Sequence, residues 1–330
     1  MRLSLDEMQT DIRDAAREVA RGRIAPQAAR WDEEGALAAG LLKELAELGF
    51  LGLLVEEGLG GSALDRTAFA LVILETAKAS GAAAVALAAH NSVALASSKH
   101  AKASGITQEL CGGERVGVLT EFREGSLTGF CGFAAPWAAV ASPGVGSDAV
   151  CLVSGQATDA SETQTPGLGL RALRPHTLVA VPGEDDAVVS GVAAEAELTL
   201  RLGLAAAMVG RGEAALAASL AYAKEREQFG KPIASFQAIQ WMIADARCRL
   251  DGAWLLTLRA AFTGRQAAMA CVHAAQAARE TCDAALQIHG GYGYTTEYPV
   301  ERCLRDSLAI STLAGGLAGQ RSAVAGSALD

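Results

Sequence analysis

The chain has 330 residues, of which 51% are hydrophobic and 5% are aromatic, and its formal net charge at pH 7 is −9. This length exceeds the usual size of a single domain, so we expect two or three domains. The acidic balance argues against nucleic-acid binding, which requires a basic surface. Seven cysteines without a C-x-x-C pair indicate reduced and mostly buried thiols.

The N-terminal segment carries charges every few residues and lacks the apolar core of a signal peptide. No uninterrupted apolar run approaches the roughly 18 residues that would span a bilayer. The sequence therefore predicts a cytoplasmic protein without a membrane segment.

Residues 1–115 have the apolar spacing of helices, and the stretch 81–98 is small and apolar enough for a helix buried on every side. Residues 116–194 differ, because short apolar or β-branched runs alternate there with turn-forming residues. This pattern predicts a small β domain, with strands at Val116–Thr120, Ala149–Ser154 and Thr177–Val181.

Helical periodicity returns over 195–330 and predicts a four-helix bundle with short connections. The first helix would be Leu198–Glu227, and Ser235 is the expected N-cap of the second. The third would be Arg265–His289, and the fourth would follow Pro299. The predicted fold class is thus mostly α, with a small central β domain.

Metal-ligand spacings are absent from the sequence, and no Glu-x-x-His pair of the kind found in di-iron bundles occurs. We therefore predict no metal site. Neither a dinucleotide-binding G-x-G-x-x-G nor a P-loop is present, and each of the five histidines, taken alone, reads as an ordinary surface or core residue.

Two segments carry patterns that favour ligand binding. The first, 222–237, ends a helix with an arginine, a glutamine and an aromatic residue, which suit a pyrophosphate and an aromatic ring. The second, 287–302, contains paired glycines that let a ligand approach the backbone. A charged helix end and a glycine-rich turn also occur without any ligand.

Together these segments closely resemble two motifs of the acyl-CoA dehydrogenase family. The motifs are R-x-Q-F-G-K-P-I-x-x-F-Q and Q-x-x-G-G-x-G-Y-x-x-E-Y-P-V-E-R-x-x-R-D, in order and at the right separation. The resemblance extends over nearly the whole chain. It implies an N-terminal helical domain, a middle β domain, a C-terminal bundle, and FAD-dependent α,β-desaturation of an acyl-CoA thioester, in which a carboxylate removes the α-proton.

The resemblance assigns FAD contacts to ten residues of this chain. They are Thr120, Ser126, Arg226, Gln228, Phe229, Phe236, Gln237, Gln287, Gly290 and Gly291.

The sequence departs from the family pattern where the catalytic base is expected. Counting from Arg305-Asp306 places Ala314 at the position of the usual glutamate and Gly316 at that of a flavin-contacting threonine. Some family members carry the base on the first bundle helix instead, and that position is Leu200. A displaced carboxylate such as Glu197 is a further alternative.

The middle domain is also compressed relative to the family. The tryptophan-containing strand that lies against the flavin is reduced to 140–143, and Trp137, three residues away, is at most a partial substitute.

These losses follow a pattern, because each flavin of the family lies at a subunit interface. The contacts that a neighbouring chain supplies to the pyrophosphate and adenine are retained, whereas the catalytic ones are missing. The chain therefore resembles the degenerate subunit of heteromeric bacterial acyl-CoA dehydrogenases, such as those of sterol side-chain degradation. We expect a homologous partner with an intact base, an acyl-CoA substrate in the complex, and electron-transfer flavoprotein as a further partner.

Two other functions stay open at the level of sequence. A flavin-dependent monooxygenase of the same fold can dispense with the glutamate, because its flavin hydroperoxide performs the reaction. A non-enzymatic pseudoenzyme would bind an acyl group or a protein partner without FAD.

Overall fold

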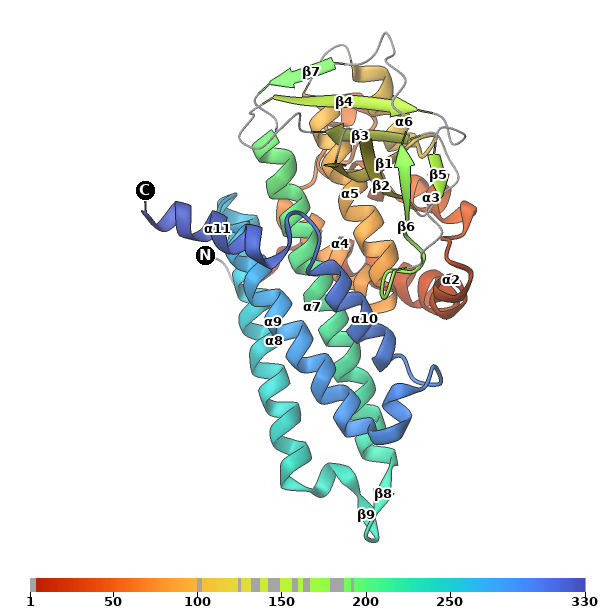
Figure 1. The fold of residues 1–330 in the computed structure, drawn as a ribbon, viewed down its shortest axis with the longest axis vertical. Helices are drawn as coiled ribbons and strands as arrows, with labels where there is room; N and C mark the ends of the chain where they lie inside the picture. Colours follow the sequence, from red (N-terminus) through yellow and green to blue (C-terminus); the bar gives the residue numbers. More distant parts are fainter. Residues whose placement is uncertain are drawn as a thin grey trace.

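The computed structural model describes residues 4–99, 103–123, 126–131, 137–141, 149–155, 160–162, 167–178, 187–190 and 193–329. Helices form both ends of the chain, and a β sheet lies between them in sequence and at one end of the molecule in space (Figure 1). The predicted fold class is confirmed.

The N-terminal region is helical through residue 112. Its helices are α1 (Glu7–Val19), α2 (Ala28–Glu34), α3 (Ala39–Glu47), α4 (Arg66–Ala79), α5 (Gly81–Ser98) and α6 (Ser104–Gly112). Side chains cap the beginnings of three of them: Asp6 accepts from the Gln9 amide, Asp65 from Ala68 and Ser80 from Ala83. Helix α5 is buried along almost its whole length, as the small apolar stretch predicts.

Seven of the described strands form one sheet in the order β5-β6-β2-β1-β3-β4-β7. They are β1 (Val116–Arg123), β2 (Ser126–Cys131), β3 (Trp137–Ala141), β4 (Ala149–Gly155), β5 (Ala160–Glu162), β6 (Arg174–Leu178) and β7 (Ala187–Ser190). Among the strand residues that the structure describes, only β1 and β3 pair in parallel, with Val116 opposite Trp137. Two predicted strands correspond to β1 and β4, whereas the third begins three residues earlier than expected, at Arg174.

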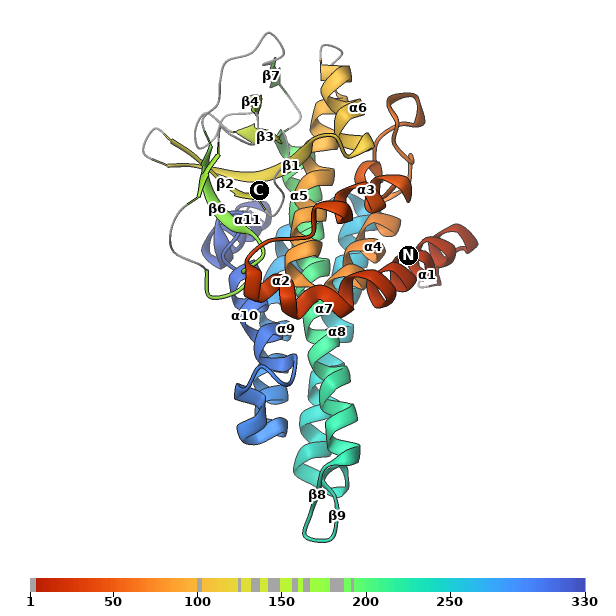
Figure 2. The same cartoon turned by 90° about the vertical axis from the view of Figure 1, so that its right-hand side faces the viewer.

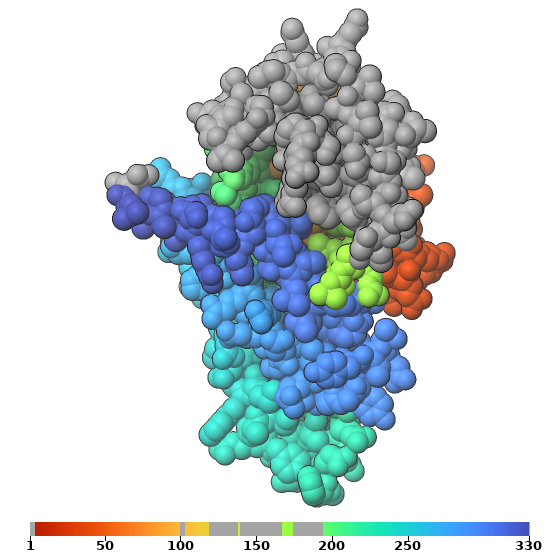
Figure 3. Space-filling view, in the orientation of Figure 1, coloured from red at the N-terminus to blue at the C-terminus, as the bar shows by residue number. Residues whose placement is uncertain are grey.

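The C-terminal region is a bundle around α7 (Ala193–Glu225), which packs against N-terminal helices and bundle helices alike. The other long helices are α8 (Gln237–Thr263), α9 (Ala267–His289) and α10 (Val300–Ile310). A fifth, α11 (Gly316–Leu329), was not predicted separately and lies across the upper bundle (Figure 3). The prediction of Ser235 as an N-cap was wrong: α8 begins after Phe236, and the Ser235 hydroxyl instead donates to the Pro232 carbonyl at 2.7 Å.

Glycines on α7 allow its neighbours to approach closely. An added Cβ at Gly203 would lie 2.6 Å from the Ala88 methyl group, and one at Gly212 would lie 2.5 Å from Leu250. The segment Ala194–Glu225 is the one described helix that is long and apolar enough to span a bilayer, but 67% of its most apolar window is buried inside the protein. It is therefore the central core helix of this fold.

Candidate functional site

The first predicted segment forms a hairpin at the far end of the bundle (Figures 1 and 2). Its strands are β8 (Glu227–Gln228) and β9 (Lys231–Pro232). Phe229 (φ 54°) and Gly230 (φ 77°) connect them. Positive φ at both central residues is the geometry of a type I′ turn, which suits a two-residue hairpin. The local sequence thus places Phe229 at the tip, where 93% of its surface is exposed.

The second segment continues from α9 into a 3-10 turn, Gly290–Tyr294. Gly290 has φ 59°, and a Cβ added at Gly290 or Gly291 would meet no atom within 4 Å. Gly293 is different, because a Cβ there would lie 2.8 Å from the Leu286 carbonyl oxygen. The first two glycines therefore border open space, and the third is required for close packing.

The two segments meet around a cavity of about 560 Å³. Of the ten predicted cofactor contacts, five line it, namely Arg226, Gln228, Gln287, Gly290 and Gly291. The Arg226 side chain has neither an ion pair nor a hydrogen bond within the described part of the chain. An unpaired guanidinium beside open glycine backbone can hold a phosphate-bearing ligand.

The other five predicted contacts do not line this cavity. Phe229 lies at the tip of the hairpin and Phe236 directly precedes α8, and their rings contact each other edge to face with centroids 6.2 Å apart. Gln237 is the first residue of α8. Thr120 lies on β1 and Ser126 on β2, but their side chains lie outside the described residues. The role of these five residues remains a prediction.

His289 lines the cavity and was missed as a site residue. Its ring stacks on Tyr222 with centroids 4.4 Å apart, and its Nδ1 donates to the Ala285 carbonyl at 2.8 Å. Burial lowers the pKa of His289. The neutral ring therefore keeps Nε2 as a buried acceptor, and it has no hydrogen-bond partner. The signal that could have found it is its position in the Q-I-H-G-G segment, directly before the glycines that border the cavity.

The position expected for the base lies between α10 and α11. Ala314, Gly315 and Gly316 have φ values of 52°, 82° and 63°, so the chain turns sharply there. The buried Gln320 donates to the Ala314 carbonyl at 2.8 Å, and the Ala314 side chain packs against the main apolar cluster. Leu200, at the alternative position, is part of the same cluster and is 9% exposed. Neither position offers a proton acceptor.

A second cavity, of about 870 Å³, lies at the start of α7 and was not foreseen. Its charged lining includes two ion pairs, Arg66 with Glu195 at 3.1 Å and Arg201 with Glu197 at 2.6 Å. Arg265 also lines it and has no acidic partner among the described residues. Glu197, the candidate displaced carboxylate, is therefore held by an arginine one helical turn away.

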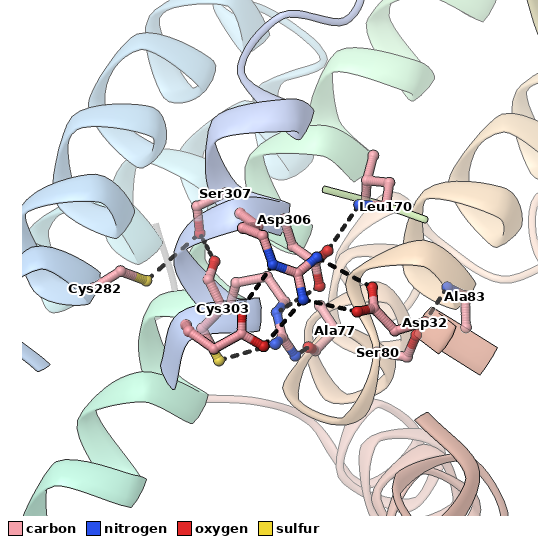
Figure 4. Close-up of polar contacts among 12 residues, drawn as sticks. Asp32, Ala77, Ser80, Ala83, Leu170, Cys282, Cys303, Asp306 and Ser307 are labelled. Atoms are coloured by element: carbon pink, nitrogen blue, oxygen red, sulfur yellow. Dashed lines mark hydrogen bonds and ion pairs between the residues drawn. The ribbon is translucent and has the colours of Figure 1, made fainter. Parts of the chain in front are cut away.

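The Arg305-Asp306 pair lies at a junction between distant segments, where Figure 4 shows Asp306 beside Leu170 and Asp32. Arg305 pairs with Asp32 of α2 at 2.7 Å and donates to the Leu168 carbonyl at 3.1 Å. Asp306 accepts from the Leu170 amide at 2.9 Å. Burial raises the pKa of Asp306, which Arg211 opposes from a distance of 3.4 Å. This part of the sequence motif has a structural role.

Two family models match the two helical regions of the chain. The N-terminal domain of acyl-CoA dehydrogenases matches residues 6–103, and the C-terminal domain matches residues 191–329. The probable acyl-CoA dehydrogenase YngJ of Bacillus subtilis is 33% identical over 361 aligned positions, covering 93% of this chain and 94% of the relative. Since the alignment is longer than this chain, YngJ has insertions relative to it.

Two further relatives extend this picture. The caffeyl-CoA reductase-Etf complex subunit CarC of Acetobacterium woodii is 30% identical over 97% of this chain and 98% of its own length. The structure of butyryl-CoA dehydrogenase from Megasphaera elsdenii superposes with a TM-score of 0.86 at 26% identity and covers 100% of both chains. Solved proteins of the same fold include one complex with FAD and one with FADH2.

Proposed function

The chain belongs to the acyl-CoA dehydrogenase family of FAD-dependent oxidoreductases, and from that premise we propose that it is the non-catalytic subunit of a heteromeric acyl-CoA dehydrogenase. In this arrangement it contributes pyrophosphate and adenine contacts to an FAD whose reaction is completed by a homologous partner chain. The partner supplies the glutamate that removes the α-proton of the acyl-CoA.

The observation that carries this proposal is the absence of a carboxylate at both positions where the family places its base. Ala314 presents a methyl group, and Leu200 is a buried aliphatic residue. Neither can accept a proton. Glu197, the remaining alternative, is engaged by Arg201 and its side chain is 54% exposed. A general base requires a carboxylate within hydrogen-bond reach of the proton that it removes.

The cavity at the hairpin fits one half of FAD. Arg226 offers a guanidinium without an acidic partner in the described chain, and the backbone at Gly290 and Gly291 is open to close approach. A pyrophosphate matches the paired donors of an arginine, and Gln228 and Gln287 add polar side chains to the same wall. When bound, the flavin of FAD supplies the acceptor for the hydride that leaves the acyl chain.

The position of this cavity favours a flavin shared between chains. The β sheet lies near the beginning of α7 and the hairpin lies at its end (Figures 1 and 2). A helix of 33 residues is about 50 Å long, which is considerably longer than a dinucleotide. The FAD held at the hairpin is therefore a different molecule from any flavin held at this chain's own β domain.

Phe229 supports the same arrangement. In the isolated chain Phe229 is 93% exposed, and the edge contact of its ring with Phe236 is its one aromatic contact among the described residues. Covering such a side chain contributes about 1.5–3 kcal/mol. A partner chain with its bound FAD would provide that cover.

The experiment compares the chain alone with the chain co-expressed with a homologue that has an intact base. We expect turnover and stoichiometric FAD only in the complex. Arg226→Gln should lower the ratio of flavin to protein in the complex, whereas Arg279→Gln, at an exposed position on α9, should leave it unchanged. Stoichiometric FAD and acyl-CoA oxidation by the purified chain alone would refute the proposal.

The same preparations separate the rival functions. Oxygen consumption driven by NADH or reduced flavin would identify a monooxygenase, and a complex without flavin that tolerates Arg226→Gln would identify a binding pseudoenzyme. Steroid acyl-CoA thioesters are the first substrates to assay, because the degenerate-subunit pattern resembles that of sterol side-chain enzymes. Electron-transfer flavoprotein is the proposed electron acceptor, since the relative CarC is named as part of an Etf complex.

A further inference from the structure

A third cavity, of about 480 Å³, lies between the N-terminal helices and the bundle and shares no lining residue with the two described above. Helices α1 and α4 form one side, and α7 and α10 form the other. Its charged lining consists of five cations and two acids: Arg17, Arg21, Lys78, Arg211, Arg302, Glu75 and Glu213. The chain as a whole is acidic, so this excess of positive charge is local.

Both acids of the lining are already neutralised within the protein. Glu75 is 3% exposed and pairs with Arg17 at 3.1 Å and with Lys78 at 3.0 Å. Glu213 pairs at 3.3 Å with Arg247, which lies on α8 outside the cavity. No acidic group of the lining is left to balance the remaining cations.

Arg211 is the most deeply buried cation and has its own partners. Its side chain is 1% exposed and lies 3.4 Å from the Asp306 carboxylate, and it donates to the Ala77 carbonyl and to the Cys303 sulfur, each at 2.9 Å. Nε is the atom that faces Asp306, and it forms an ion pair without a hydrogen bond. Arg211 is thus balanced inside the protein, and the cations of the lining that remain are Arg21 and Arg302.

Arg21 and Arg302 have no acidic partner in the part of the chain that the structure describes. Arg302 is half-buried, and its Nε is buried without a hydrogen-bond partner. Arg21 is exposed, so only Arg302 is partly desolvated, and a guanidinium in that state is unfavourable unless it is paired. Oxyanions match the donor geometry of both arginines. The volume lies within the usual range for small-molecule sites.

We propose that this cavity binds a small anion that carries a phosphate or several carboxylates, with Arg21 and Arg302 contacting its oxygens. Because Arg21 follows α1 and Arg302 lies on α10, a bound anion would connect the N-terminal helical domain with the bundle. It would therefore stabilise the folded protein, independently of FAD binding at the hairpin.

The test titrates the full-length protein with inorganic phosphate and, separately, with citrate at constant ionic strength. Calorimetry and the thermal midpoint report binding. We expect saturable binding and a rising midpoint with at least one of the two anions, and their comparison distinguishes a phosphate from a polycarboxylate site. The double variant Arg21→Gln/Arg302→Gln should bind at least tenfold more weakly, and it should fold normally because it removes no ion pair.

The matched control is Arg30→Gln/Arg279→Gln, which removes the same charge from exposed positions on α2 and α9. It should retain the affinity of the unmodified protein. If neither anion binds saturably, or if the control loses as much affinity as the cavity variant, the cavity is not an anion site.

Discussion

His90 should make the stability of this protein depend on pH between 7 and 5. It lies on α5 with 1% of its surface exposed, and both ring nitrogens are used. The Gly117 amide donates to Nδ1 at 3.1 Å, so the ring proton is on Nε2, which faces the Leu110 carbonyl at 3.2 Å. Protonation of Nδ1 would set its N–H against the Gly117 N–H, so the hydrogen bond that joins α5 to β1, the first strand of the middle domain, would be lost.

The size of the effect follows from the pKa. Burial lowers the pKa of His90 from 6.5 to about 4. The unfolded chain therefore binds more protons than the folded one between these values, and the stabilisation present above pH 6.5 is lost as the pH falls through 4. Each pKa unit corresponds to about 1.4 kcal/mol, so about 2 kcal/mol of unfolding free energy should be lost between pH 7 and pH 5 through this group.

Denaturant unfolding at pH 7, 6 and 5 measures this dependence in three proteins. His90→Gln removes the titrating ring, so its loss of stability between pH 7 and 5 should be smaller than that of the unmodified protein by about 2 kcal/mol. His273→Gln removes a histidine from the exposed surface of α9 without touching the contact between α5 and β1. If the curves for His90→Gln and the unmodified protein run parallel, the assignment of a buried neutral His90 is wrong.

Three further substitutions, the first with a matched control, test the junction and the loop at the base position by denaturant unfolding. Gly169→Ala should lower the unfolding free energy by about 3 kcal/mol, because the added Cβ would collide with the Arg305 carbonyl oxygen. The control Gly252→Ala, whose Cβ would meet no atom within 4 Å, should raise the unfolding free energy by up to about 1 kcal/mol. Equal effects of the two substitutions would contradict the packing at Gly169. Asp32→Asn should lower the unfolding free energy by about 3 kcal/mol, because Arg305, whose side chain is 12% exposed, then keeps Glu301 as its remaining acidic partner. A loss near zero would show that Glu301 alone neutralises Arg305. Ala314→Gly should stabilise by about 1 kcal/mol by relieving the left-handed backbone, and a destabilisation would argue against that conformation.

The sequence determined the parts of this protein that depend on near neighbours. The small apolar stretch located α5, and helical periodicity located the long bundle helices α7, α8 and α9. The hairpin at Phe229-Gly230 was not predicted, because the first bundle helix was expected to continue through Glu227 and ends at Glu225. Counting from Arg305-Asp306 identified Ala314. Local prediction was less successful at Ser235, because a serine that precedes a helix can equally well donate its hydroxyl to the preceding turn.

Only the tertiary structure decided which distant residues meet. Arg226 and Gln287 belong to different helices, and nothing in their own segments places them around one cavity. The stacking of His289 on Tyr222, the cavity at the start of α7 and the unpaired Arg21 and Arg302 are likewise set by how whole helices pack. The physical reason is that caps, turns and periodicity are short-range properties of the chain, whereas a site is made by contacts whose positions depend on every element that packs between them.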